Sequence, residues 1–194
     1  MNPADLLEQA RQCTLCSVEL PHAPRPILMF SAQAVINLIG QAPGKVAHDK
    51  QTPWLDASGD RLRQWLGIEK EQFYQQQLVN VLPMSFCFPG YKNGADAPPL
   101  KGCAPRWHQQ FLTLSNASLT LYVGRYAQQN YLPEYPNLTD AVADYKTLLA
   151  HNCIALPHPS GRNNRWLKRH AWFEQSALPA LRNRVTDLLA RQLG

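Results

Sequence analysis

Four short apolar segments, separated by segments of helical periodicity, constrain the fold of this chain more than any other feature. The apolar segments are Ala34–Ile39, Leu78–Leu82, Leu119–Val123 and Cys153–Leu156. Apolar residues at three- and four-residue spacing predict helices over Ser58–Leu66, Ala104–Leu114, Thr139–Ala150 and Trp172–Leu193. Strands that alternate with helices favour a parallel sheet covered by helices on both faces. We therefore expect an α/β fold, a three-layer α/β/α sandwich around a central four-stranded parallel sheet.

The whole chain, residues 1–194, is expected to form a single domain. Hydrophobic residues make up 45% of it and charged residues 17%, which allows a full core and excludes a disordered tail. No apolar run reaches the roughly 18 residues that a membrane span requires. The polar segment Asp5–Gln12 lacks the charged start, apolar middle and cleavage site of a signal peptide. We expect a cytoplasmic monomer with no membrane partner.

The excess positive charge of the chain is concentrated in its last part. The net charge is +5, and residues 161–194 contain seven Lys or Arg against two Asp or Glu. The seven are Arg162, Arg165, Lys168, Arg169, Arg182, Arg184 and Arg191. Such a basic patch is typical of proteins that bind a polyanion such as nucleic acid. A solvated helix face is the other interpretation, and the charge alone does not separate the two.

Four of the five cysteines are grouped in a way that indicates a metal site. Cys13 and Cys16 form a C-x2-C pair, and Cys87 and Cys103 are 16 residues apart. Because cytosolic proteins rarely keep structural disulfides, we interpret these four thiols as ligands. Four thiolates suit either a tetrahedral zinc ion or an iron–sulfur cluster, and their spacing does not separate these. Cys153 lies in an apolar segment and fits an ordinary buried thiol.

The segments that follow the expected strands are candidates for one binding cleft. Ligands of open parallel sheets bind at the carboxyl ends of the strands. The first strand is followed by Gly40–Gly44, with the sequence GQAPG, and the third by Gly124–Tyr126. The last strand runs into Pro157–Asn163, which contains His158. Small, rigid and polar groups at these strand ends are therefore expected to meet at one edge of the sheet.

These segments resemble the two signature motifs of the uracil-DNA glycosylase superfamily. The first motif is Gly40–Gly44, and the second is His158–Ser160, with the sequence HPS. The layout of the four cysteines resembles the iron–sulfur branches of that superfamily, families 4 and 5. The resemblance extends from Cys13 to the arginines that follow His158. It implies the fold expected above and a structural 4Fe–4S cluster held by Cys13, Cys16, Cys87 and Cys103.

The resemblance also implies roles for individual residues. His158 matches the family histidine that hydrogen-bonds O2 of uracil and stabilises the departing anion. Asn80 matches the asparagine that reads the Watson–Crick edge of uracil. Trp54 falls where the family has a phenylalanine that stacks on the base, and an ordinary core aromatic fits the spacing equally well. The backbone of the first motif would line the pocket floor through Gly40, Gln41 and Ala42. Phosphates next to the extruded nucleotide would contact Ser160, Arg162 and Arg165.

The first motif departs from the family pattern at two positions that matter for catalysis. Family 4 has acidic residues where this chain has Gln41 and Ala47. A glutamine cannot act as a general base for water, so that role does not transfer. Family 5 instead uses an aspartate in a Gly-Asp-x-Ser-Gly segment, which Asp56–Gly59 resembles with Leu55 in place of the first glycine.

Asp56 is therefore our candidate for orienting water or stabilising the cationic sugar. It fits equally well as the N-cap of the helix that begins at Ser58. His48 and Asp49 are further candidates on the same loop.

The sequence as a whole indicates a monofunctional DNA repair glycosylase. It would hydrolyse the N-glycosidic bond of uracil, or of another deaminated base, in DNA and leave an abasic site. The missing acids at Gln41 and Ala47 motivate an alternative, a catalytically weak or inactive DNA-binding member of the same fold. A zinc-stabilised α/β protein that acts on small molecules would explain the cysteines, but neither the second motif nor the charge distribution.

Overall fold

The computed structural model describes residues 2–74 and 78–193 as an α/β sandwich around a four-stranded parallel sheet. The strands are β1 (Ile36–Ile39), β2 (Val79–Val81), β5 (Leu119–Val123) and β6 (Cys153–Leu156). Their order is β2-β1-β5-β6, and each neighbouring pair is parallel. The expected three-layer fold is therefore confirmed, with each strand inside the segment that the sequence predicts.

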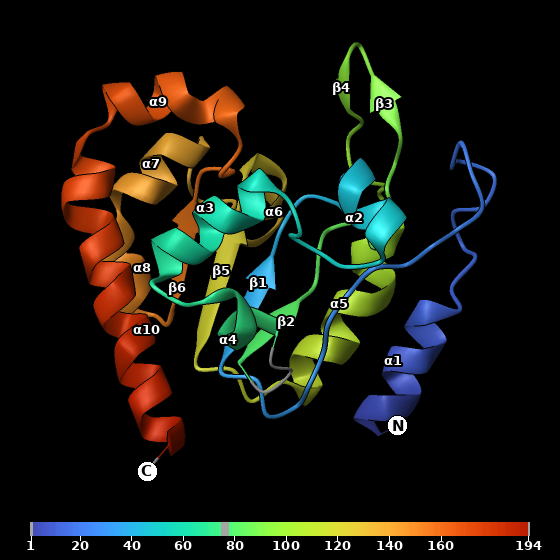
Figure 1. Cartoon of the computed structure of the whole chain (residues 1–194), viewed down its shortest axis with the longest axis horizontal. Helices are drawn as coiled ribbons and strands as arrows, with labels where there is room; N and C mark the ends of the chain where they lie inside the picture. Colours follow the sequence, from blue (N-terminus) through green and yellow to red (C-terminus); the bar gives the residue numbers. More distant parts are fainter. Residues whose placement is uncertain (1, 75–77, 194) are drawn as a thin grey trace.

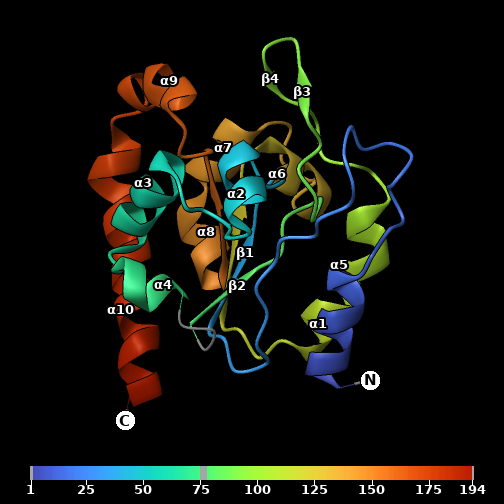
Figure 2. The ribbon, with the colours of Figure 1, turned by 45° about the vertical axis from the view of Figure 1, so that its right-hand side comes forward.

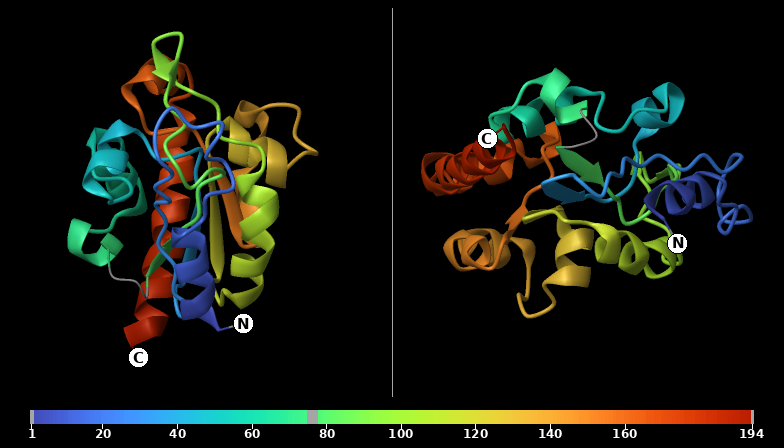
Figure 3. Two further views of the ribbon diagram at one scale, coloured as in Figure 1. Left: turned by 90° about the vertical axis from the view of Figure 1, so that its right-hand side faces the viewer. Right: turned by 90° about the horizontal axis from the view of Figure 1, so that it is seen from below.

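The helices cover both faces of this sheet (Figures 1 and 3). One face carries α3, α4 and α10, and the other carries α5, α6, α7 and α8 (Figure 3). A short hairpin of β3 and β4 stands clear of both layers beside α2 (Figures 1 and 2). The bounds are α1 (Pro3–Arg11), α2 (Lys45–Lys50), α3 (Ala57–Leu66), α4 (Lys70–Tyr74), β3 (Tyr91–Lys92), β4 (Ala95–Asp96), α5 (Cys103–Leu114), α6 (Arg125–Tyr131), α7 (Leu138–Ala143), α8 (Tyr145–Ala150), a 3-10 turn (Gly161–Asn163), α9 (Asn164–Arg169), a π-helical turn (Phe173–Ala177) and α10 (Leu178–Leu193).

Two of the expected helices are interrupted. The segment Thr139–Ala150 forms α7 and α8, which are separated at Asp144 by a residue outside the helical conformation (φ −87°, ψ 30°). The segment Trp172–Leu193 begins with the π-helical turn before α10 starts at Leu178. Apolar spacing predicts which face of a segment is buried. It does not reveal these local breaks, because the apolar face of the segment stays nearly continuous through them.

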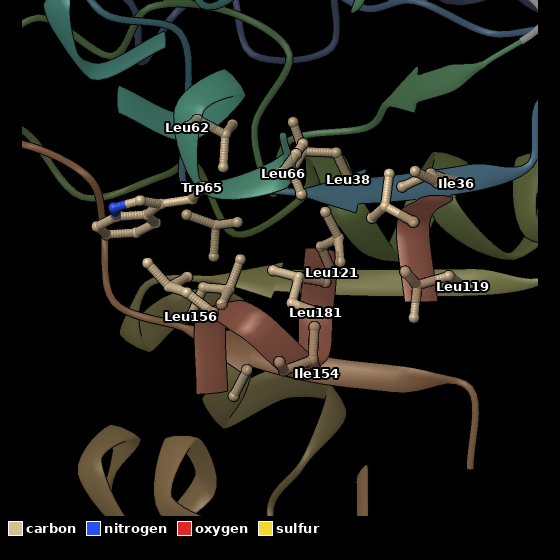
Figure 4. Packing of buried hydrophobic residues seen from close by; sticks show 14 of the residues in the cluster. Ile36, Leu38, Leu62, Trp65, Leu66, Leu119, Leu121, Ile154, Leu156 and Leu181 are labelled. Atoms are coloured by element: carbon tan, nitrogen blue, oxygen red, sulfur yellow. The ribbon is translucent and has the colours of Figure 1, made fainter. Parts of the chain in front are cut away.

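The main core is built around the sheet, with buried residues of α3 and α10 on one face and of α7 and α8 on the other. Leu62 and Leu66 of α3 and Leu181 of α10 lie against side chains of the strands (Figure 4). All four residues of β1 are buried, as expected for a central parallel strand that is covered on both faces. None of the helices in the described parts of the chain is long and apolar enough to cross a membrane.

A buried polar network ties β1 and β2 together on the other face. Asn80 of β2 pairs in register with Asn37 of β1, and its side-chain nitrogen donates to Oδ1 of Asn37 at 2.9 Å. The side-chain oxygen of Asn80 accepts from the backbone nitrogen of Ser31 at 2.7 Å. The hydroxyl of Ser115 donates to Oδ1 of Asn37 at 2.9 Å. Asn80 is fully buried, so these contacts replace its hydration.

We predict that Asn80→Ala destabilises the fold, because it leaves the backbone nitrogen of Ser31 without its acceptor and removes one of the two donors to Oδ1 of Asn37. The expected loss is about 1–3 kcal/mol in the free energy of unfolding, measured by urea denaturation. Asn130→Ala, at an exposed position of α6, is the matched control and should change stability little. Equal stability of the two variants would contradict this account of the network.

Candidate active site

A cleft of about 400 Å³ opens at the carboxyl edge of the sheet. Segments that follow all four parallel strands contribute to its wall, as the strand-end argument predicts. Its volume is in the range of pockets that bind small molecules or a single extruded nucleotide. The lining residues include Gly40, Gln41, Ala42, Trp54, Asp56, Pro83, Asp96, Arg125, Tyr126, His158, Ser160 and Arg162.

The first motif lies between β1 and α2 and forms the floor of the cleft. The backbone oxygen of Gly40 accepts from the nitrogen of Met84 at 2.9 Å, and that of Gln41 accepts from Ser85 at 3.2 Å. These bonds extend the pairing of β1 with β2 past the end of the strands. The motif is therefore held as rigidly as the sheet itself, and its small residues leave room for a ligand.

Trp54 forms one side of the cleft in a backbone conformation that few side chains adopt. Its φ is +57°, in the left-handed region, which costs about 1–3 kcal/mol for a non-glycine residue. The guanidinium of Arg63, itself buried, donates to the backbone oxygen of Trp54 at 3.0 Å. A Cβ at Gly59 would lie 1.7 Å from that oxygen, so only glycine fits there. Two neighbours in α3 thus fix the position of the indole.

The indole of Trp54 contacts both signature motifs. A Cβ at Gly40 would lie 3.1 Å from Cζ2 of Trp54, so the absence of a side chain at Gly40 lets the ring approach closely. The ring centroids of Trp54 and His158 are 5.4 Å apart, at an interplanar angle of 30°. The remaining surface of the indole is an apolar, aromatic wall of the kind on which nucleobases stack.

His158 follows β6 and faces the cleft with a neutral ring. Burial lowers the pKa of His158, and the negative charges of Asp56 and Asp96 oppose this effect without reversing it. Within the described residues, no protein group hydrogen-bonds to either ring nitrogen of His158. A neutral imidazole with a free N–H can donate a hydrogen bond to a developing oxyanion, as in other enzymes that use a histidine electrophile.

Three side chains hold the second motif in place. The side-chain amide of Asn163 donates to the backbone oxygen of His158 at 2.7 Å. Arg61 of α3 donates to the backbone oxygen of Ser160 at 3.3 Å. Arg162 donates to the backbone oxygen of Gly94 at 3.1 Å and so connects the second motif to the β3–β4 hairpin. Ser160 and Arg162 line the cleft.

Asp56 is both the N-cap of α3 and a residue of the cleft wall. Its Oδ1 accepts from the backbone nitrogen of Gly59 at 2.9 Å, which makes Asp56 the N-cap of α3. The same residue lines the cleft, and its charge acts on His158. Of the two further candidates, Asp49 pairs with Lys45, and the ring of His48 packs near those of His22 and Phe88.

Asn80 lies next to the residues of β2 that reach the cleft. It lies within β2 and is enclosed by its network with Asn37, Ser31 and Ser115, and it is not among the described residues that line the cleft. Val81, the last residue of β2, and Pro83 line the cleft at that edge. A role of Asn80 in reading the base stays a prediction.

The basic residues near the end of the chain divide into two sets. Arg162 lines the cleft, and Arg165, Lys168 and Arg169 are exposed on or beside α9; Arg165 is not among the described lining residues. Arg182 and Arg184 of α10 instead donate to the backbone oxygens of Gln64 and Ser118. Only the first set offers positive charge to a polyanion near the cleft.

The four cysteines converge as the sequence predicts. Cys13, Cys16, Cys87 and Cys103 line a single small cavity, together with apolar residues such as Leu20, Phe86 and Leu100. Burial raises the pKa of Cys16, that of Cys87 to about 11 and that of Cys103 to about 12. Thiolates in this cavity therefore need a cationic partner, and such a partner would release their protons.

The donor set suits a metal centre. Four thiols in an apolar cavity fit an iron–sulfur cluster or a tetrahedral zinc ion. Among the described residues, no group of three or more His, Cys, Asp or Glu side chains is already placed to hold one metal ion.

Three residues of the site have no counterpart in the sequence analysis. Asp96 lines the cleft from the β3–β4 hairpin, an exposed segment with no apolar pattern to indicate its position. Arg61 and Arg63 act through the backbone oxygens of Ser160 and Trp54, so only the fold reveals their targets. Arg125 and Tyr126 line the cleft after the third strand, in the segment that the strand-end argument names.

The fold and the site together define an α/β protein with a nucleotide-sized cleft at the carboxyl edge of a parallel sheet. The family model of the uracil DNA glycosylase superfamily matches residues 29–182. The chain belongs to this superfamily. The match includes both signature motifs, the β3–β4 hairpin and all of α9.

We predict that His158 makes the stability of the protein depend on pH. The half-buried ring of folded His158 has a lowered pKa. As the pH falls below the ordinary histidine pKa of about 6.5, the unfolded chain therefore takes up a proton more readily than the folded protein, and stability falls. Above that pKa both states are neutral and His158 contributes nothing to the pH dependence. Between about pH 7 and pH 5, the His158→Gln variant should therefore lose less unfolding free energy than the wild type.

The measurement is urea denaturation at several pH values, with His151→Gln as the control at an exposed position. That control should keep the slope of the wild type. A His158→Gln variant with the wild-type slope would show that His158 is not buried in its neutral form.

Proposed function

We propose that this protein is a monofunctional DNA glycosylase that hydrolyses the N-glycosidic bond of uracil, or of another deaminated base, in DNA. The observation that carries the proposal is the meeting of His158 with Trp54 and the first motif in one cleft. A glycosylase needs a pocket for an extruded base, a donor for the charge on the leaving base and a positively charged approach for DNA. Each of these has a candidate here.

In this proposal, the extruded base enters the cleft and stacks on the exposed surface of Trp54. As the bond between C1′ of the sugar and N1 of uracil lengthens, negative charge develops on the base and positive charge on the sugar. The N–H of neutral His158 donates to O2 of uracil and stabilises the charge on the base. The carboxylate of Asp56 lies on the same cleft and stabilises the cationic sugar.

Phosphates on either side of the extruded nucleotide would be bound by the second motif and α9. Ser160 and Arg162 line the cleft, and Arg165 lies further out on the exposed face of α9. Contacts of Lys and Arg with phosphates make binding weaken steeply with salt. Salt-dependent binding of DNA is therefore part of the proposal.

We expect His158→Ala to slow base excision by about 100- to 1,000-fold, because it removes the donor for the developing anion. The measurement is a single-turnover assay on an oligonucleotide with one uracil, in which abasic sites are cleaved by alkali and separated on a denaturing gel. His151→Ala is the matched control and should excise at the wild-type rate. A His158→Ala variant as fast as this control would remove His158 from the mechanism.

The same assay separates the alternative function. A wild-type protein that binds DNA in a salt-dependent manner, and yields no cleavage at uracil or at a panel of deaminated bases, would be a non-catalytic DNA-binding member of the superfamily. The absence of acids at Gln41 and Ala47 is the observation that favours this second candidate.

We also propose that Cys13, Cys16, Cys87 and Cys103 hold a structural 4Fe–4S cluster. It would tie the segment after α1 and the loop after β2 to the start of α5. The cluster would contribute stability, and the steps proposed above need only side chains of the cleft.

Protein purified without oxygen should then contain about four iron atoms per chain and absorb visible light. Cys103→Ser should lose the iron and lower the melting temperature, whereas Cys153→Ser, outside the cavity, should keep both. Zinc in place of iron, or neither metal in the wild type, would contradict the cluster.

A further inference from the structure

Two carboxylates, Asp56 and Asp96, line the cleft, and they differ in their hydrogen bonds to the rest of the protein. Asp56 already accepts a hydrogen bond from the backbone nitrogen of Gly59 as the cap of α3. Within the described residues, no hydrogen bond or ion pair is found to the carboxylate of Asp96. One oxygen of Asp56 thus caps α3, whereas the carboxylate of Asp96 is available to a ligand in the cleft.

The β3–β4 hairpin that carries Asp96 is fastened to both signature motifs. The side-chain amide of Gln41 donates to the backbone oxygen of Ala97 at 3.4 Å, next to Asp96 in the chain. Arg162, which follows the second motif, donates to the backbone oxygen of Gly94, in the turn between β3 and β4. Ala97 also donates to the oxygen of Gly90 at 2.9 Å and closes the base of the hairpin. The hairpin stands at the carboxyl edge of the sheet, beside α2 (Figures 1 and 2).

These contacts place the Asp96 carboxylate over the first motif. A Cβ at Gly44 would lie 3.6 Å from Oδ2 of Asp96, so the carboxylate packs against the motif's last glycine. Its charge also acts on His158, which lies on the opposite motif. Asp96 therefore lies between the two motifs that flank the cleft.

We propose that Asp96 is the general base of the reaction, supplied by the hairpin in place of the acids that the first motif lacks. Gln41 cannot accept a proton from water, but its amide donor holds the segment that carries Asp96. An acid at position 41 would have no N–H for the oxygen of Ala97. The replacement of the acid by glutamine and the presence of Asp96 are thus parts of one arrangement.

In the proposed step, the oxygen of one water molecule forms a bond to C1′ of the sugar, and the bond from C1′ to N1 of uracil breaks. The bonding pair leaves with uracil, whose anion is stabilised by His158. The water proton passes to the Asp96 carboxylate, and solvent later removes it. Asp56, with one oxygen bound to Gly59, remains the stabiliser of the cationic sugar.

This inference rests on the proposed function, and its test keeps the two apart. Single-turnover excision is measured for the wild type, Asp96→Asn and Asp187→Asn, which makes the same charge change at an exposed position of α10. We expect Asp96→Asn to be at least about 100-fold slower than Asp187→Asn, with affinity for uracil-containing DNA unchanged or tighter. Formate, a small carboxylate, should restore part of the rate of Asp96→Ala and none to His158→Ala.

If Asp96→Asn excises uracil at the rate of Asp187→Asn, and the wild type is active, the role of Asp96 alone is overturned. If Asp96→Asn binds DNA more weakly and formate does not rescue Asp96→Ala, Asp96 holds the hairpin in place, and the inference is also overturned. A wild type and an Asp187→Asn variant that both fail to excise any deaminated base would contradict the proposed function, and the inference with it.

Discussion

The parallel register of four short strands is the constraint on which the rest of this structure depends. Because β1 pairs in parallel with both β2 and β5, and β5 with β6, all four carboxyl ends meet at one edge of the sheet. Segments separated by more than a hundred residues, such as Gly40 and His158, therefore line the same cleft. Backbone bonds past the strand ends, from Met84 to Gly40 and from Gly124 to Leu156, extend this rigidity to the floor of the cleft.

Within this fold, residues of α3 hold Trp54 and the second motif in place. Arg63 fixes the strained backbone of Trp54, Gly59 leaves room for it, and Arg61 holds the second motif. Asp56, whose carboxylate caps the start of the same helix, also lines the cleft. The free energy stored in the left-handed conformation of Trp54 is offset by contacts that also make the aromatic wall rigid. A preorganised wall needs no rearrangement when a base is bound, which is the arrangement that electrostatic catalysis requires.

The sequence predicts the sheet, its flanking helices and both signature motifs, because apolar periodicity and small-residue motifs are local signals. It indicates that Asn80 is a buried polar group in need of partners, but not that Asn37, Ser31 and Ser115 are those partners. It misses Asp96, whose approach to Gly44 depends on how a hairpin folds back across fifty residues. The charge count likewise overstates the basic surface, because Arg182 and Arg184 bind backbone oxygens instead.

The central claim is that the cleft between the two motifs releases a base from DNA. The most direct measurement is detection of free uracil by mass spectrometry after incubation of the wild-type protein with single-stranded and duplex DNA that contain uracil. The account predicts free uracil and an abasic site in equal amounts, with the rest of the DNA intact. DNA that is bound but keeps every uracil, and every other deaminated base, would contradict it.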